Sequence, residues 1–260
     1  MKNLDTINHG ALAAFARRIV VHGEALGNHS CRVGELAVEL GRELGLSGSA
    51  LISLRWAGQL HDLGKTVIAR SLLMKTEALD EAEWTAIETH PVIGYELLIE
   101  SSPEFHDLAL AVRSHHERWD GLGYPNHLSG EAISLFGRIV AIVDVYDALT
   151  SHRPYRPVPF SHDAAVHLIR AESGSHFDPA MVDAFLELER RGTMNASRAD
   201  GPMSAESCRM KVSSLAFDPR TARGCVHGGP LRRSLHAPAW PVLLNSHRPR
   251  TTAPGPADSL

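Results

Sequence analysis

Seven histidine and aspartate residues stand out because they recur, singly or in pairs, at the ends of the predicted helices. Imidazole and carboxylate groups are the common protein ligands of divalent metals, and they also serve as general acids and bases. A single histidine at a helix end is more often a capping or surface residue. So many in one chain instead indicate a shared metal site, with the candidates His29, His61, Asp62, His90, His115, His116 and Asp144.

Asp144 gives the strongest local argument for a bound cation. Its neighbours on a predicted helix are apolar, and no lysine or arginine lies within one turn; Arg138 is nearly two turns back. A buried, unpaired carboxylate costs several kcal/mol, so a cation or a metal should compensate it.

The pattern of the first 191 residues predicts a largely helical protein. Apolar residues recur with helical spacing in 30–44, and Gly45 is expected to end that helix. Further helices are predicted within 51–64, 80–90, 106–116 and 179–191. The segment 138–149 is rich in β-branched residues and could be a buried strand. Because no second strand is evident, we predict a buried helix and an all-α fold.

Two helix starts carry specific signals. Asp80 and Glu83 have the spacing of a capping box. Asp178 followed by Pro179 is typical of an N-cap and the first helical position.

Composition divides the chain near residue 192. Residues 192–260 hold 8 of the 15 prolines and no isoleucine. Such a segment is too poor in core residues to fold alone. We therefore predict a leading helical segment at 1–27, a catalytic domain at 28–191 and a disordered tail at 192–260, the alternative for the tail being a small irregular subdomain.

Charge and hydropathy exclude some partners. The net charge of −4 gives no reason to expect nucleic acid. No window of about 18 uncharged apolar residues is present, and the N-terminus does not read as a signal peptide. We expect a cytoplasmic protein that does not contact a membrane.

Five stretches together resemble the HD-GYP domain, a branch of the HD metal-dependent phosphohydrolases. They are "HDLGK", "THPVIG", "HHERWDGLGYP", "RIVAIVDVYDALTSHRPYR" and "SGSHFDP", and the resemblance covers about residues 28–188. It implies an HD-type helical bundle and a phosphodiesterase that hydrolyses cyclic di-GMP to pGpG or GMP.

The resemblance also implies two divalent metals, with iron or manganese first and zinc, nickel or magnesium as alternatives. His29, His61, Asp62 and Asp144 would hold one metal, while His90, His115 and His116 would hold the second, with Asp62 bridging the two. Because Ala25 stands where some family members carry a third-metal glutamate, and Glu24 is out of register, two metals are expected rather than three.

Four further residues have roles implied by the resemblance. Lys65 would bind and stabilise the scissile phosphate. Arg153 and Arg156 would bind substrate phosphates through their guanidinium groups. Tyr124, in the "GYP" loop, would contact substrate, and the loop could also serve protein contacts.

Departures from the family keep other functions open. The stretch "TVIAR" after Lys65 lacks the usual "GVP" turn. The alternatives are a catalytically weak module that binds cyclic di-GMP or another protein, and a phosphohydrolase acting on a different cyclic dinucleotide.

Overall fold

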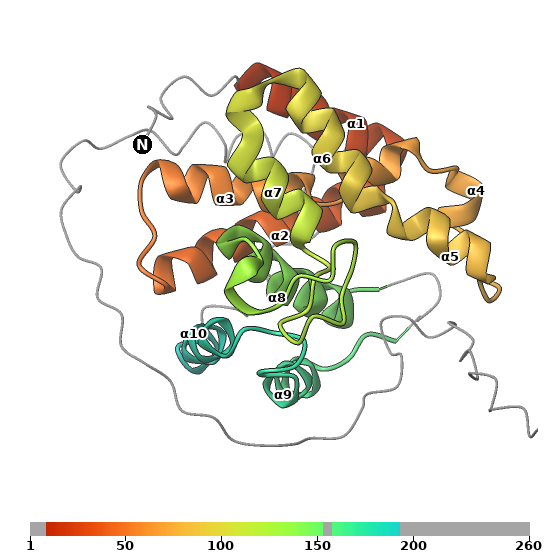
Figure 1. The fold of residues 1–260 in the computed structure, drawn as a ribbon. Helices are drawn as coiled ribbons and strands as arrows, with labels where there is room; N and C mark the ends of the chain where they lie inside the picture. Colours follow the sequence, from red (N-terminus) through yellow and green to blue (C-terminus); the bar gives the residue numbers. More distant parts are fainter. Residues whose placement is uncertain (1–8, 153–157, 193–260) are drawn as a thin grey trace, which may run out of the picture.

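A computed structural model describes residues 9–152 and 158–192 as a bundle of helices (Figure 1). Within these residues there is no β-strand, only an isolated bridge between Ser173 and Phe177. The all-α prediction is therefore confirmed. The α-helices are α1 (His9–His22), α2 (Glu24–Glu43), α3 (Ser49–Leu60), α4 (Arg70–Leu73), α5 (Glu81–Glu88), α6 (His90–Ser101), α7 (His106–Ser114), α8 (Leu135–Thr150), α9 (His162–Ala171) and α10 (Pro179–Arg190). Short 3₁₀ turns are η2 (Leu63–Val67), η3 (Pro103–Phe105) and η4 (Gly130–Ala132).

Helices α2 and α8 form the centre of the bundle. The apolar stripe of α2 is buried, including Val33, Leu36 and Leu40. The β-branched segment 138–149 is part of α8, as predicted, and its isoleucines and valines are largely buried. Helix α2 packs against both α3 and α8. Helices α2 and α8 can therefore present polar side chains to one another inside the core.

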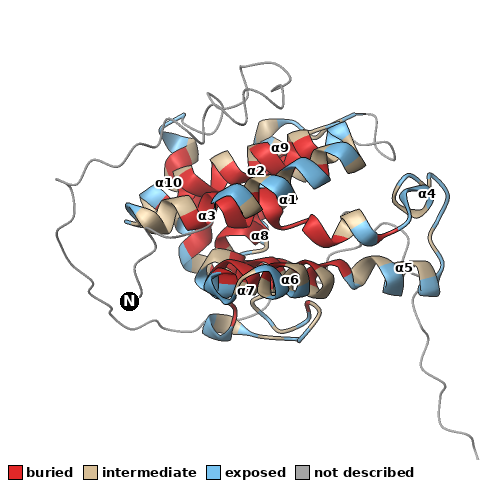
Figure 2. Cartoon of the chain, turned by 90° about the horizontal axis from the view of Figure 1, so that it is seen from above, coloured by how far each residue is buried: buried red, intermediate tan, exposed pale blue. Residues whose placement is uncertain are grey.

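The other helices cover this centre (Figure 1). Helices α6 and α7 pack as a pair, and α7 contacts α3 and α8, while α9 and α10 pack on the opposite side of α8. Helix α1 packs on α2 and buries Leu12 and Ile19. Helices α4 and α5 have no buried residues and project from the body (Figure 2).

The predicted helix boundaries agree closely with the structure, with two differences. The capping box of Asp80 and Glu83 forms, and Asp178 caps α10. Helix α3 ends at Leu60 rather than continuing to Gly64, because the chain tightens into η2. Helix α2 begins at Glu24, so it crosses the predicted boundary between residues 27 and 28 without interruption.

The predicted tail, residues 192–260, lies almost entirely outside the described residues. The domain division therefore stays a prediction. Within the described part of the chain, no helix is both long and apolar enough to cross a bilayer.

Candidate metal centre

All seven predicted ligands come together as two adjacent groups. The first cluster is His29, His61 and Asp144, and the second cluster is Asp62, His90, His115 and His116. Within each cluster, one nitrogen or oxygen atom per residue lies within 4.8 Å of the corresponding atoms of the others. The edge of the His61 ring faces the ring of His115, with centroids 5.1 Å apart, so the clusters adjoin.

The two clusters are built from different kinds of structural element. In the first, His29 lies inside α2 and Asp144 inside α8, and their side chains meet at 3.0 Å between Nε2 and Oδ1. His61, the third member, follows the end of α3. The sequence suggested that His29 lies at a helix end. The structure places it inside α2 instead. In the second cluster, Asp62 follows the end of α3, His90 begins α6, and the His115–His116 pair follows α7.

Asp62 lies between the clusters. Its carboxylate oxygens are 3.3 Å from His61 Nε2 and 3.3 Å from His90 Nε2. Gly64 makes this approach possible, since a Cβ there would overlap the carbonyl oxygen of His90. The turn after α3 therefore packs backbone to backbone against the first turn of α6, which positions Asp62 beside His90.

Three of the histidines share one local arrangement. The Nδ1 atoms of His61, His90 and His115 lie 2.7–2.8 Å from the carbonyl oxygen three residues earlier, those of Gly58, Ile87 and Val112. A carbonyl only accepts, so Nδ1 carries the proton, and in the neutral form of each ring Nε2 keeps its lone pair. Those carbonyls lie in the last turn of a helix, where the regular helical hydrogen-bond pattern ends.

The electrostatics separate the two clusters. Burial raises the pKa of Asp144, but the neighbouring His29 and His61 lower it by more. The pKa of Asp144 therefore lies well below its usual range. Burial lowers the pKa of His61, yet the carboxylates of Asp62 and Asp144 leave it raised overall. In the second cluster burial dominates, and the pKa of His115 falls to about 4.

His90 and His116 behave like His115. Burial, together with Lys65 for His90 and the adjacent histidines for His116, holds the pKa of both well below the ordinary value. The second cluster therefore presents neutral imidazoles at neutral pH, the form that binds metals.

The donor arrangement fits divalent cations. His90 Nε2 and His115 Nε2 lie 3.3 Å apart, and both carry lone pairs, so a cation between them would replace repulsion with coordination. His61 Nε2 is buried without a hydrogen bond. Buried polar atoms without a partner are rare and call for an explanation such as a bound ion. Glu24 and Ala25 are both exposed, so neither adds a ligand.

Lys65 lies directly beside the carboxylate of Asp62. Its Nζ is 2.7 Å from Asp62 Oδ1 and 2.8 Å from Oδ2. The lysine together with His61 outweighs the effect of burial, and the pKa of Asp62 lies well below its usual range. The side chain of Lys65 is 23% exposed, so its ammonium group lies at the solvent edge of the centre.

The "GYP" loop backs the second cluster. The Tyr124 ring stacks on His116, with centroids 4.8 Å apart and planes at 25°, and Tyr124 N donates to His116 O at 3.1 Å. A Cβ at Gly123 would overlap backbone atoms of Arg118 and His116, so only glycine allows this contact. Burial raises the pKa of the Tyr124 phenol well above 10.

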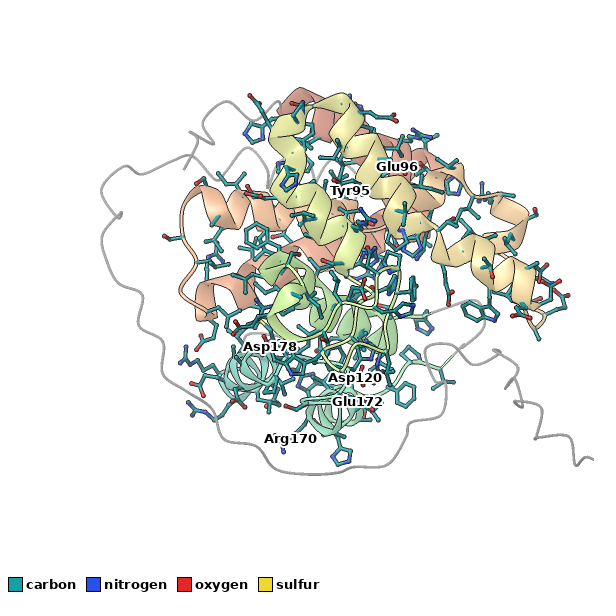
Figure 3. The ribbon with its side chains drawn as sticks, viewed as in Figure 1. Tyr95, Glu96, Asp120, Arg170, Glu172 and Asp178 are labelled. Carbon is teal, nitrogen blue, oxygen red and sulfur yellow. The ribbon has the colours of Figure 1, made fainter. Side chains whose placement is uncertain are left out.

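Two carboxylate groups that the sequence reasoning missed hold this loop. Buried Glu117 accepts hydrogen bonds from the backbone amides of Asn126 and Leu128 at 2.7 and 3.0 Å. Asp120 pairs with Arg118 at 2.7 Å, and Arg118 also lies 3.8 Å from Glu172. Figure 3 shows Asp120 and Glu172 near one another. The signal for Glu117 was its place directly after the histidine pair.

The segment 172–179, which contains "SGSHFDP", also binds the loop. Trp119 N and Asp120 N donate to the carbonyls of His176 and Ser175, at 3.0 and 2.9 Å. Arg138 joins the same region by pairing with Asp178 at 2.6 Å and lying over the Trp119 ring. The family-like motif after α9 thus has a structural role in holding the loop.

Asp147 and Arg32 are further residues that the sequence reasoning did not single out. Asp147 Oδ2 is 2.7 Å from His29 Nδ1, and Arg32 pairs with both Asp147 oxygens at 2.6 and 2.9 Å. The available signal was a second aspartate one turn after Asp144 on an apolar helix. Arg153 and Arg156, the predicted phosphate-binding arginines, lie outside the described residues.

Comparison with known proteins identifies the family of this chain. The HD domain family matches residues 14–181. The chain is 39% identical over 213 residues to the Cyclic di-GMP phosphodiesterase response regulator RpfG of Xanthomonas campestris pv. campestris, covering 82% of this chain and 55% of that protein. It is 36% identical over 173 residues to the 3'3'-cGAMP-specific phosphodiesterase 2 of Vibrio cholerae, covering 66% of this chain and 33% of the relative.

The chain thus spans only a third to about half of the length of these relatives. Among solved structures, an HDG"Y"P protein of Bdellovibrio bacteriovorus superposes with a TM-score of 0.53 at 16% identity, covering 72% of this chain and 65% of that one. This likeness supports the fold. The chain belongs to the HD domain family, with the motifs of its HD-GYP branch.

Proposed function

We propose that this chain is a metal-dependent phosphodiesterase that hydrolyses cyclic di-GMP to pGpG or GMP. The observation that supports it most is the convergence of five histidines and two aspartates as two adjacent clusters with Asp62 between them. The named activity of the relative from Xanthomonas supports the choice of substrate.

We propose that the first cluster together with Asp62 holds one divalent metal and that His90, His115 and His116 hold a second, Asp62 bridging both. Iron or manganese is the first choice. Metals bound in this way polarise a phosphoryl oxygen and supply a hydroxide nucleophile near neutral pH. Five imidazoles and two carboxylates leave such a centre net positive, which suits an anionic phosphodiester.

The residues around the centre have separate roles in this proposal. Lys65 would leave Asp62 and bind the scissile phosphate, whose developing charge its ammonium group stabilises. Arg153 and Arg156 would bind the substrate phosphates as bidentate donors. Tyr124 would contact substrate, and its stacking on His116 supports this role.

A second cyclic dinucleotide is a specific alternative, because one relative is named for 3'3'-cGAMP. The "GYP" loop could also serve protein contacts, since Leu122 at its tip is 77% exposed. A catalytically weak module would keep this surface and bind cyclic di-GMP without hydrolysing it.

A hydrolysis assay separates these functions. Full-length protein loaded with iron or manganese is incubated with cyclic di-GMP, 3'3'-cGAMP and cyclic di-AMP, and the products are separated by HPLC. We expect cyclic di-GMP to be hydrolysed fastest. Intact cyclic di-GMP that is nevertheless bound would instead identify a binding module, and faster hydrolysis of another dinucleotide would reassign the substrate.

The domain division can be tested in the same assay. We propose that residues 28–191, together with the packed helix α1, suffice for activity. A chain ending at residue 191 should keep its melting temperature and turnover nearly unchanged. A large fall in melting temperature would instead indicate that residues 192–260 contribute to the folded domain.

A further inference from the structure

His29 differs from the other ligand candidates in its second hydrogen bond. His61, His90 and His115 follow helix C-terminal turns, whose carbonyl oxygens accept from Nδ1. His29 lies inside α2, where the preceding carbonyls are engaged by the helix. Its Nδ1 instead meets a carboxylate from another helix, Asp147 Oδ2, at 2.7 Å.

Arg32 fixes the position of that carboxylate. It lies one turn after His29 on α2, and its Nε and Nη2 bind the two oxygens of Asp147 at 2.6 and 2.9 Å. Nη2 also donates to Ser151 Oγ, at the end of α8, at 3.2 Å. A guanidinium bound to both oxygens of a carboxylate leaves it little freedom to rotate.

The two ends of the His29 ring therefore face two carboxylates of the same helix. Asp144 lies 3.0 Å from Nε2 and Asp147 lies 2.7 Å from Nδ1, one turn further along α8. Asp147 is 2% exposed, so no solvent replaces its contact with the ring. Rotation of the ring about its χ2 angle would break both contacts at once.

A purely structural ion pair on the same helix offers a comparison. Arg138, also on α8, pairs with buried Asp178 at 2.6 Å, and neither residue contacts a candidate ligand. Asp147 has the same kind of arginine partner and similar burial, but one of its oxygens binds His29 directly. This contact distinguishes a positioning role from helix-to-helix pairing alone.

We propose that Asp147, held in place by Arg32, is a positioning residue that fixes the ring of His29 with Nε2 toward the first cluster and thereby sets the metal affinity of that cluster. The inference rests on the proposed metal-dependent function. Carboxylates that bind the far nitrogen of a metal-bound imidazole typically contribute 10- to 100-fold to affinity or activity.

The test is metal binding by the full chain with Asp147→Asn, with Asp178→Asn as the matched control. Mn²⁺ binding is followed by equilibrium dialysis, and electron paramagnetic resonance distinguishes paired from single Mn²⁺ ions. We expect Asp147→Asn to weaken one of two sites roughly 10- to 100-fold and to leave the other unchanged. Asp178→Asn, whose partner Arg138 lies beside the "GYP" loop, should not weaken the site that Asp147→Asn weakens, whatever it does to the melting temperature.

Two results would overturn the proposal. The first is that Asp147→Asn binds metal at both sites with wild-type affinity. The second is that both sites weaken equally, in proportion to a fall in the melting temperature of the metal-free protein. If Asp147→Asn does not fold, Arg32→Gln, whose side chain is 29% exposed in the wild type, should still weaken the same single site. Unchanged binding in that variant contradicts the proposal. Wild-type protein that binds no metal would instead refute the proposed function itself.

Discussion

The two clusters place similar side chains by different means. The first cluster is formed mainly across the centre of the bundle by the long helices α2 and α8, with an ion-paired carboxylate behind His29. Its third member, His61, follows the end of α3. The second is formed at helix ends, with backbone carbonyls behind its histidines and the "GYP" loop against His116. The first therefore depends on pairing between helices, whereas the second depends on loops and helix termini.

This difference has consequences for how each cluster responds to change. Side chains within packed helices move little unless the core is disturbed. Helix ends and loops open at lower free-energy cost. We therefore expect changes near α2 and α8 to act on the first cluster alone, and changes in the "GYP" loop to act on the second.

The largest effect is expected at Asp62, which is a member of the second cluster and also lies beside His61 of the first. Asp62→Ala should lower turnover by more than about 100-fold, because the contacts of Asp62 with His61 and His90 are lost together. This loss exceeds the one typical of residues that hydrogen-bond to a metal ligand without binding the metal. Asp144→Asn should release metal from the first cluster only. Steady-state kinetics and metal analysis check both. Asp107→Asn, on an exposed carboxylate, is the control, and near wild-type turnover of Asp62→Ala would reject the site assignment.

Acid should act on the support of the second cluster through His176. Burial, with Arg118 beside it, lowers the pKa of His176 from 6.5 to about 4. The unfolded chain therefore binds a proton between pH 6.5 and 4 that the folded chain does not, and stability present above pH 6.5 is lost as the pH falls. The contribution is at most about 3 kcal/mol.

Urea unfolding of the metal-free protein at several pH values measures this loss. His176→Gln should flatten the fall in unfolding free energy between pH 6.5 and 4, and the exposed His167→Gln should not. An identical slope in His176→Gln and wild type would show that His176 does not couple the loop to acid.

Gly123→Ala should disturb the second cluster without touching the first. The added methyl overlaps the backbone of His116 and Arg118, so the loop must shift and Tyr124 must lose its stacking on His116. We expect a loss of about 1–3 kcal/mol, typical of overpacking, and weaker metal binding at one site. Gly23→Ala, where the nearest heavy atom is 4.0 Å away, is the control for denaturation and dialysis. Equal weakening of metal binding at both sites would contradict the independence of the two clusters.

The smallest effect is expected for Tyr124→Phe, which keeps the ring but removes the hydroxyl. Metal binding should not change, since stacking on His116 remains. If the hydroxyl contacts substrate, KM should rise roughly fivefold, the equivalent of about 1 kcal/mol for one hydrogen bond. Tyr95→Phe, under Arg113, is the matched control. An unchanged KM would remove Tyr124 from the substrate-binding residues.

The sequence predicted the helices and the ligand set better than it predicted their support. Apolar spacing and caps are local, so α2, α5, α8 and α10 could be located from pattern alone. The seven ligands were identified by residue type and motif. Asp144 was also identified by physical argument, because a carboxylate on an apolar helix requires a partner.

The missed residues share a physical reason. Asp147 is 118 positions from His29, and Glu117 is recognised only by the amides of a loop that must first fold. Their roles depend on pairing between distant elements, which local spacing does not encode. The beginning of α2 was also missed, since Gly23 has no capping side chain and little marked Glu24 as a helix start.

Gly64 has a consequence for how this site can vary among related chains. The distance between Asp62 and His90 is set by contact between two stretches of main chain, and main chain cannot relax by changing rotamer. A related protein could therefore exchange one metal-binding side chain for another and keep a working centre. A residue of any other type at position 64 would push the two halves apart, so glycine here should vary less than the ligands themselves.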